Sequence, residues 1–121
     1  MKNEVIYRYD SSSDVLGIKV NRRFRYHQTV EIDDVTLLDF DVGDVPVSLE
    51  VIDASKRFNF PPKSMNDITS LSLDVCVDEK SIALKASVSV LVDGTQRTHK
   101  LESSTCNQYD ISNGKTRFEL A

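Results

Sequence analysis

The sequence predicts an all-β protein whose antiparallel strands pack as a sandwich or as a partly open barrel. Apolar and polar residues alternate with period two along many segments, which is typical of strands buried on one face. Turn dipeptides that contain glycine separate several of these segments, and no helical period persists over ten residues. The 121 residues are enough for one domain with its own core.

The second half of the chain carries the clearest strands, at residues 71–77 and 82–92. A turn at Glu79-Lys80 makes the numbers of opposed residues sum to 159, so that Leu71 faces Val88. Every apolar side chain of the pair then lies on one face, as the selection of a strand register requires.

Asp93-Gly94 is a strong signal for a tight hairpin, because both central positions of a type I′ turn need φ > 0. This turn pairs Lys85 with Glu102 across two strands. It also places Arg97 and His99 on the apolar face, which predicts that this face is only partly covered near the turn.

Asn113-Gly114 has the same hairpin chemistry, and we expect it to set Tyr109 against Phe118 and Ile111 against Thr116. Residues 67–121 are therefore interpreted as a meander of long antiparallel strands.

The first half is interpreted as a meander of shorter strands over residues 1–57, and the whole of 1–121 as one domain. Pro46 lacks a backbone donor, so a strand begins there or lies at an edge. Alternation stops over 53–66, with 58–66 as the crossover between the two meanders, and we expect a short irregular or helical segment there. The strands expected in this half cover 5–9, 15–20, 27–32, 36–40 and 45–51.

Residues 7–57 resemble the domain-of-unknown-function family 2283. The resemblance lies in Tyr9–Ile18, which reads YDSSSDVLGI, in Leu38–Gly43, which reads LDFDVG, and above all in Leu49–Arg57, which reads LEVIDASKR. A glycine typical of the family is replaced here by Val47-Ser48. The resemblance implies an antiparallel β fold and no catalytic residues. Some members resemble components encoded near toxin-like partners, which favours a protein-binding role.

Composition narrows the classes of partner. The formal net charge of −4 gives no general attraction to nucleic acid or anionic lipid, and no apolar run is long enough to span a membrane. The start of the chain lacks a signal-peptide pattern, so we expect a cytoplasmic protein. Cys76 and Cys106 lack zinc-site spacing and are expected to be free thiols. We expect no cofactor.

The sharpest local feature is a basic segment, residues 19–27, that contains Arg22, Arg23, Arg25 and Tyr26. From Gln28 to Asp53 the chain has acidic residues and no Lys or Arg. Arginines beside aromatic rings are typical of surfaces that grip phosphates and stack bases. The plainer interpretation is a solvated hairpin loop whose arginines face the acidic strands, and we favour it given the net negative charge.

No recognised catalytic, nucleotide-binding or metal-binding motif occurs, so we assign no catalytic residue and no metal ligand. His27 and His99 are the two histidines, and neither lies in a motif. The aspartates between Asp33 and Asp44 do not match a calcium loop and are interpreted as solvated turns.

The sequence establishes no activity, and three function classes remain open. We expect a non-enzymatic protein-interaction domain that uses a sheet edge or the basic segment, with homodimerisation as one way to cover exposed edges. The second class is a nucleic-acid-binding module that uses Arg22, Arg23, Arg25 and Tyr26. The third is a small-ligand binder or cryptic enzyme with a pocket near Arg97 and His99. A filled interior would argue against the third class.

Overall fold

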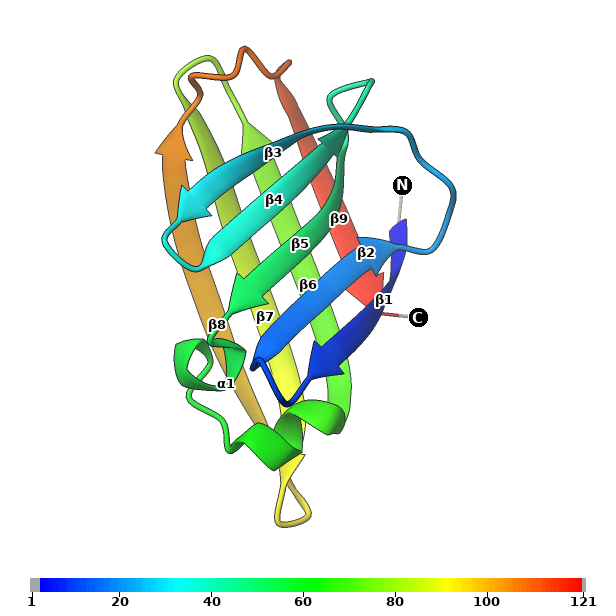
Figure 1. Cartoon of the computed structure of the whole chain (residues 1–121), viewed down its shortest axis with the longest axis vertical. Helices are drawn as coiled ribbons and strands as arrows, with labels where there is room; N and C mark the ends of the chain where they lie inside the picture. The colour runs from blue at the N-terminus through cyan, green and yellow to red at the C-terminus, as the bar shows by residue number, and fades with distance from the viewer. Residues whose placement is uncertain (1–2, 121) are drawn as a thin grey trace.

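Nine strands of the described residues, 3–120, form one sheet that curls into a half-barrel in the computed structural model (Figure 1). The order across the sheet is β3-β4-β5-β2-β1-β9-β6-β7-β8. The predicted all-β class is confirmed, in its partly open barrel form. The strands are β1 (Asn3–Asp10), β2 (Val15–Val20), β3 (Tyr26–Asp33), β4 (Thr36–Asp41), β5 (Pro46–Ile52), β6 (Ile68–Val77), β7 (Ser81–Val92), β8 (Thr95–Cys106) and β9 (Gly114–Leu120).

The core lies between the two arms of the curled sheet, one made of β1 to β5 and the other of β6 to β9. In Figure 1, β1 to β5 cross in front of the steeper strands β6 to β9. Alternate side chains point inward, as the period-two pattern predicts, and those of Leu16, Leu38, Leu73 and Leu84 are at most 3% exposed. A single sheet therefore buries its own apolar face, because its two arms fold over each other.

The register of the β6-β7-β8 meander is the predicted one. Leu71 pairs with Val88, and Lys85 pairs with Glu102 on the outer face. The Lys85 Nζ lies 4.0 Å from a Glu102 carboxylate oxygen, and both side chains are about 70% exposed. The two short turns set this register locally, which is why the sequence alone was sufficient.

The predicted hairpin at Asn113-Gly114 is wrong. β9 begins at Gly114 and runs antiparallel to β6 and parallel to β1, so Phe118 lies opposite Leu73 rather than Tyr109. The residues before β9 form a compact loop, in which the Asn107 side chain bonds both the N–H and the C=O of Ile111. That loop redirects the chain into the gap between the two arms of the sheet.

The first half is not a simple meander. β3, β4 and β5 are consecutive, but β5 then pairs with β2, which gives the order of a Greek key. Residues 21–25 are its long connection, so the basic segment is not a hairpin loop. The connection is fixed by backbone bonds from Asn21 N–H to Glu4 O, 2.9 Å, and from Val42 N–H to Arg25 O, 3.0 Å.

The crossover over 53–66 is partly helical, as predicted. It holds α1 (Ala54–Arg57) and a short 3-10 helix over Pro62–Asn66, and Phe58 and Phe60 between them are buried. Of the two placements expected for Pro46, the start of a strand is the observed one, because β5 begins at this residue. No helix of residues 3–120 is long and apolar enough to cross a membrane.

Replacement of Phe118 by Ala should destabilise the fold strongly, because its inward ring packs where β9 joins β1 to β6 and is 2% exposed. We expect the free energy of unfolding to fall by about 3–5 kcal/mol in a urea titration. The control is Arg117→Ala on the outer face of the same strand, where the side chain is 53% exposed. Equal losses for the two variants would contradict the assigned orientation of β9.

Candidate functional site: an outer groove over Gly17

The interior of the half-barrel is filled by side chains. The cavity described there measures about 10 Å³ and is lined by residues from both arms, among them Val5, Leu38, Leu73 and Phe118. This is about the smallest space that holds one water molecule. This space is too small for a ligand larger than water, so a binding site is to be sought on the surface of the molecule.

Arg97 and His99 both lie on β8, and His99 is packed rather than open. Its ring stands against that of Phe60, with centroids 4.7 Å apart, and its Nδ1 meets the backbone carbonyl of Phe58. Arg97 is exposed close to the Asp93-Gly94 turn. The histidine ties β8 to the crossover, which accounts for the polar residue on the apolar face.

Arg22, Arg23, Arg25 and Tyr26 lie along and just after the Greek-key connection, and all four are exposed. Tyr26 is 57% exposed, and its hydroxyl lies 2.7 Å from that of Thr29. Within residues 3–120 none of the three arginines forms an ion pair, although Arg25 lies beside the end of the acidic strand β4, where its carbonyl accepts from Val42 N–H. This connection and the start of β8 lie at opposite ends of the molecule (Figure 1).

A groove of about 570 Å³ crosses the outer face of β1, β2, β5 and β4. Gly17 forms the middle of its floor, paired with Arg8 on one side and Glu50 on the other. A Cβ at Gly17 would lie 3.8 Å from the Arg8 carbonyl oxygen, which is ordinary contact. The backbone therefore tolerates a side chain here, and the missing side chain is what leaves the face hollow.

Charges of opposite sign face each other across this groove. Arg8 and Lys19 come from β1 and β2, whereas Asp39 and Glu50 come from β4 and β5. Arg8, Lys19 and Glu50 make no ion pair within residues 3–120. Beside them Ile6 is 44% exposed, so the groove combines apolar surface with unpaired charge.

The Asp39 carboxylate is already occupied by hydroxyl donors. Thr29 Oγ1 donates to Oδ1 at 2.6 Å, and Ser48 Oγ donates to Oδ2 at 2.5 Å. These bonds hold one acidic wall of the groove in a fixed orientation. Glu50 is left as the more available acidic group.

A second polar cluster joins the β1-β2 turn to α1. Tyr9 Oη donates to Asp14 Oδ1 at 2.6 Å, and the backbone N–H and hydroxyl of Ser55 donate to the two carboxylate oxygens at 3.0 and 2.8 Å. Ala54 N–H also donates to the Asp14 carbonyl, at 2.9 Å. The Asp14 carboxylate accepts three hydrogen bonds, so its role is structural.

Electrostatics agree with that interpretation. Burial, followed by the hydrogen bond and the negative charge of Asp14, raises the pKa of Tyr9 to about 12. Burial alone would raise the pKa of Asp14, but hydrogen bonds from Tyr9 and Ser55 outweigh it and lower that pKa below its ordinary value. A tyrosine that stays protonated and an aspartate that stays charged form a stable donor–acceptor pair.

Asp33 closes the seam between the two arms. Its Oδ2 accepts from Arg57 Nη2 at 2.8 Å and from Ser103 Oγ at 2.6 Å, and its Oδ1 accepts from Val35 N–H at 3.0 Å. Burial opposes ionisation of this carboxyl, but these donors lower its pKa overall. No group of three or more His, Cys, Asp or Glu side chains is arranged to hold a metal ion among residues 3–120.

The family described as "Protein of unknown function (DUF2283)" has a model that matches residues 6–55. Residues 6–55 match this family. The DUF2283 segment contains nearly all of β1 to β5, the whole groove over Gly17 and the Tyr9–Asp14–Ser55 cluster, and it ends at Ser55. The resemblance noted in the sequence is confirmed for this first part of the chain.

One curated relative comes from the archaeon Methanosarcina mazei and is called "Putative hypoxanthine phosphoribosyltransferase". It is 27% identical over 84 residues, which are 69% of this chain and 67% of the relative. No solved structure matches.

Replacement of Asp14 by Asn should lower the free energy of unfolding by about 1–2 kcal/mol near pH 7, because charged hydrogen bonds to Tyr9 and Ser55 are lost. The lowered pKa gives Asp14 a stabilising effect that is present above its ordinary pKa of 3.8 and disappears as pH falls through its folded value. The gap between wild type and variant should therefore shrink in urea titrations at acid pH.

The control for this variant is Asp93→Asn. Asp93 also has positive φ, 50° against 56° for Asp14, but it is exposed at a hairpin tip. Asn tolerates this backbone conformation, so we expect almost no change in stability at either pH. A gap for Asp14→Asn that is constant with pH would contradict a role for its charge.

Proposed function

We propose that this chain is a non-enzymatic interaction domain that binds an extended segment of a partner protein across the groove over Gly17. The observation that carries the proposal is a floor glycine flanked by Arg8 and Glu50, neither of which forms an ion pair with any residue of 3–120. A glycine inside a strand often marks a place where a ligand or another backbone approaches closely. The filled interior supports the proposal, since it directs binding to the surface.

The charges define the partner's chemistry. Arg8 and Glu50 lie on strands that are two apart, roughly 10 Å across the sheet. An extended chain advances about 3.3 Å per residue and alternates its side chains between two faces, so an acidic and a basic side chain about four positions apart, on one face, reach both walls. A small aliphatic side chain between them fills the hollow over Gly17 and contacts Ile6. We expect this partner to be met in the cytoplasm.

The groove over Gly17 does not suit the activity in the archaeal relative's name. Phosphoribosyl transfer requires binding of a polyanionic phosphate donor. The groove over Gly17 instead sets two acidic side chains opposite two basic ones, which suits a polypeptide with both signs of charge better than a diphosphate.

The test fills the groove. Gly17→Tyr places a large ring on its floor, and Ser87→Tyr places the same ring on the outer face of β7, away from the groove. Each variant and the wild type are used as bait in lysate from the native cell, with and without nuclease. We expect at least one protein to be captured by wild type and Ser87→Tyr, lost by Gly17→Tyr, and retained after nuclease treatment.

Equal capture by all three baits would contradict the groove as the binding surface. Both tyrosine variants are first checked for unchanged thermal unfolding, because either side chain lies on a polar outer face and should leave the core intact.

A second candidate function is nucleic-acid binding through the Greek-key connection. It is supported by three exposed arginines that form no ion pair with the described part of the chain, and by Tyr26 at 57% exposure. Arg22→Ala with Arg23→Ala should abolish salt-sensitive binding of a fluorescent single-stranded oligonucleotide, measured by anisotropy. The matched control is Lys63→Ala with Lys80→Ala, two exposed basic residues elsewhere. Binding that the arginine changes leave intact would eliminate this candidate.

A further inference from the structure

The two edges of the sheet differ in how they are protected. β3 is the edge of one arm, and its pairing with β4 has two register shifts, which bend and shorten a regular edge. β8 is the edge of the other arm, and all twelve of its residues pair with β7 without a shift. Within residues 3–120, β7 is the one strand that β8 pairs with. A long, regular and unpaired edge is a template for another strand.

The inward side chains of β8 are already in use. His99 packs on Phe60, Leu101 is 4% exposed, and Ser103 donates to Asp33. What β8 offers to a partner is therefore its backbone edge and its outward row of side chains.

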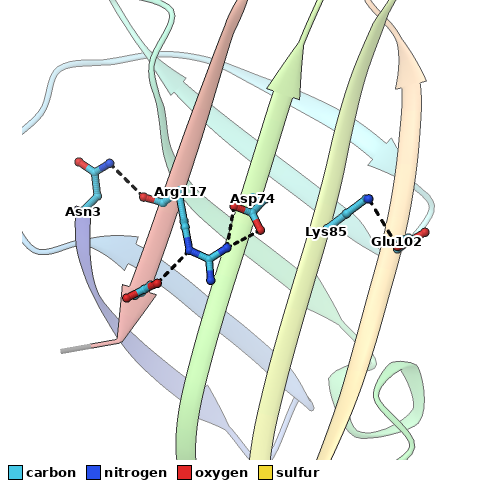
Figure 2. A network of polar contacts seen from close by, with 6 residues as sticks. Asn3, Asp74, Lys85, Glu102 and Arg117 are labelled. Carbon is cyan, nitrogen blue, oxygen red and sulfur yellow. Dashed lines mark hydrogen bonds and ion pairs between the residues drawn. The ribbon is translucent and has the colours of Figure 1, made fainter. Parts of the chain in front are cut away.

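The outward row continues a pattern of alternating charge. Figure 2 shows Arg117, Asp74, Lys85 and Glu102 in one line across β9, β6, β7 and β8, and these residues are directly paired from strand to strand. Arg117 binds Asp74 at 2.8 Å. Glu102 stands at the end of this line, and the next strand position would favour a cation.

The chain itself supplies that cation. Two copies that pair by their edges about a two-fold axis keep the same face outward, so the numbers of opposed residues sum to an even total. A sum of 202 sets Leu101 of one copy opposite Leu101 of the other. Lys100 of each copy then faces Glu102 of the other copy, which gives two symmetric pairs. Sums of 200 or 204 set Lys100 against Lys100, or Glu102 against Glu102, and like charges directly opposite are destabilising.

We infer that two copies of this chain form a homodimer through antiparallel pairing of their β8 strands, with Lys100 of each copy opposite Glu102 of the other. The dimer extends the sheet through the edge of β8, which has no bulge to protect it. It is independent of the groove over Gly17, which lies on the opposite arm of the sheet.

The first test is charge reversal, read as mass by sedimentation. Wild type should sediment at twice the 13.7 kDa of one chain. Lys100→Glu and Glu102→Lys each place like charges at two symmetric positions, and each should weaken dimerisation about tenfold or more. The double variant restores opposite charges and should recover the dimer. Lys85→Glu, which disrupts pairing within one copy, is the control and should remain dimeric.

The second test fixes the register. The sum of 202 places Gln96 opposite Cys106 of the other copy, whereas in one copy they stand at opposite ends of β8. Gln96→Cys, in a Cys76→Ser background, should give a disulfide-linked dimer on mild oxidation. Thr98→Cys in the same background faces Ser104 instead and should give much less. A monomeric wild type, or a dimer that charge reversal and the Gln96 variant leave unaffected, overturns the inference.

Discussion

The whole structure depends on one sheet covering its own apolar face. Residues 3–120 contain no second sheet and no long helix to bury the inward side chains, so the two arms must fold over each other. Side chains such as Phe40, Phe58 and Phe118 then fill the space between the arms. The same constraint leaves the outer face largely polar, and at the groove Gly17 removes a side chain while Ile6 adds an apolar one.

Two polar clusters keep the sheet curled, because hydrogen bonds fix the relative orientation of its segments and hydrophobic burial is not directional. Asp14 fixes the β1-β2 turn to α1, and Asp33 fixes the β3-β4 turn to Arg57 and β8. Two segments that carry the family resemblance, Tyr9–Ile18 and Leu49–Arg57, contain the Tyr9, Asp14 and Ser55 side chains of the first cluster. These two segments therefore contribute hydrogen bonds that stabilise the fold. Residues that bind a partner have to be sought elsewhere in the DUF2283 segment.

The sequence predicted those strand pairings that short turns determine. Asp93-Gly94 and the four-residue turn before β7 set the register of β6, β7 and β8, and the alternation over 71–77 and 82–92 assigned the inward residues of these two segments correctly. Pairings between distant segments had no such signal. The insertion of β9 between β1 and β6 and the return of β5 to β2 depend on which edges remain unpaired after the local hairpins have formed.

The same limit applies to the candidate sites. Arg22, Arg23 and Arg25 could be singled out because their charge is visible in the sequence, whereas the groove is a hollow that appears only when four strands lie side by side. The signal that could have found it is Gly17, at an outward position inside a strand. His99 was correctly placed on the apolar face, but its packing on Phe60 depends on a crossover whose path the sequence did not predict. The cytoplasmic location stays a prediction.

The position of β9 also affects how the chain can be synthesised. β1 and β6 are made long before β9, and each must wait with an unpaired edge until the segment that pairs with both leaves the ribosome. Sheets whose neighbours are far apart in the chain form slowly, and unpaired edges are prone to aggregate during that delay. A nascent chain that stalls before residue 114 would therefore present two open edges, at β1 and β6, in addition to those of β3 and β8, which makes it a natural client for chaperones.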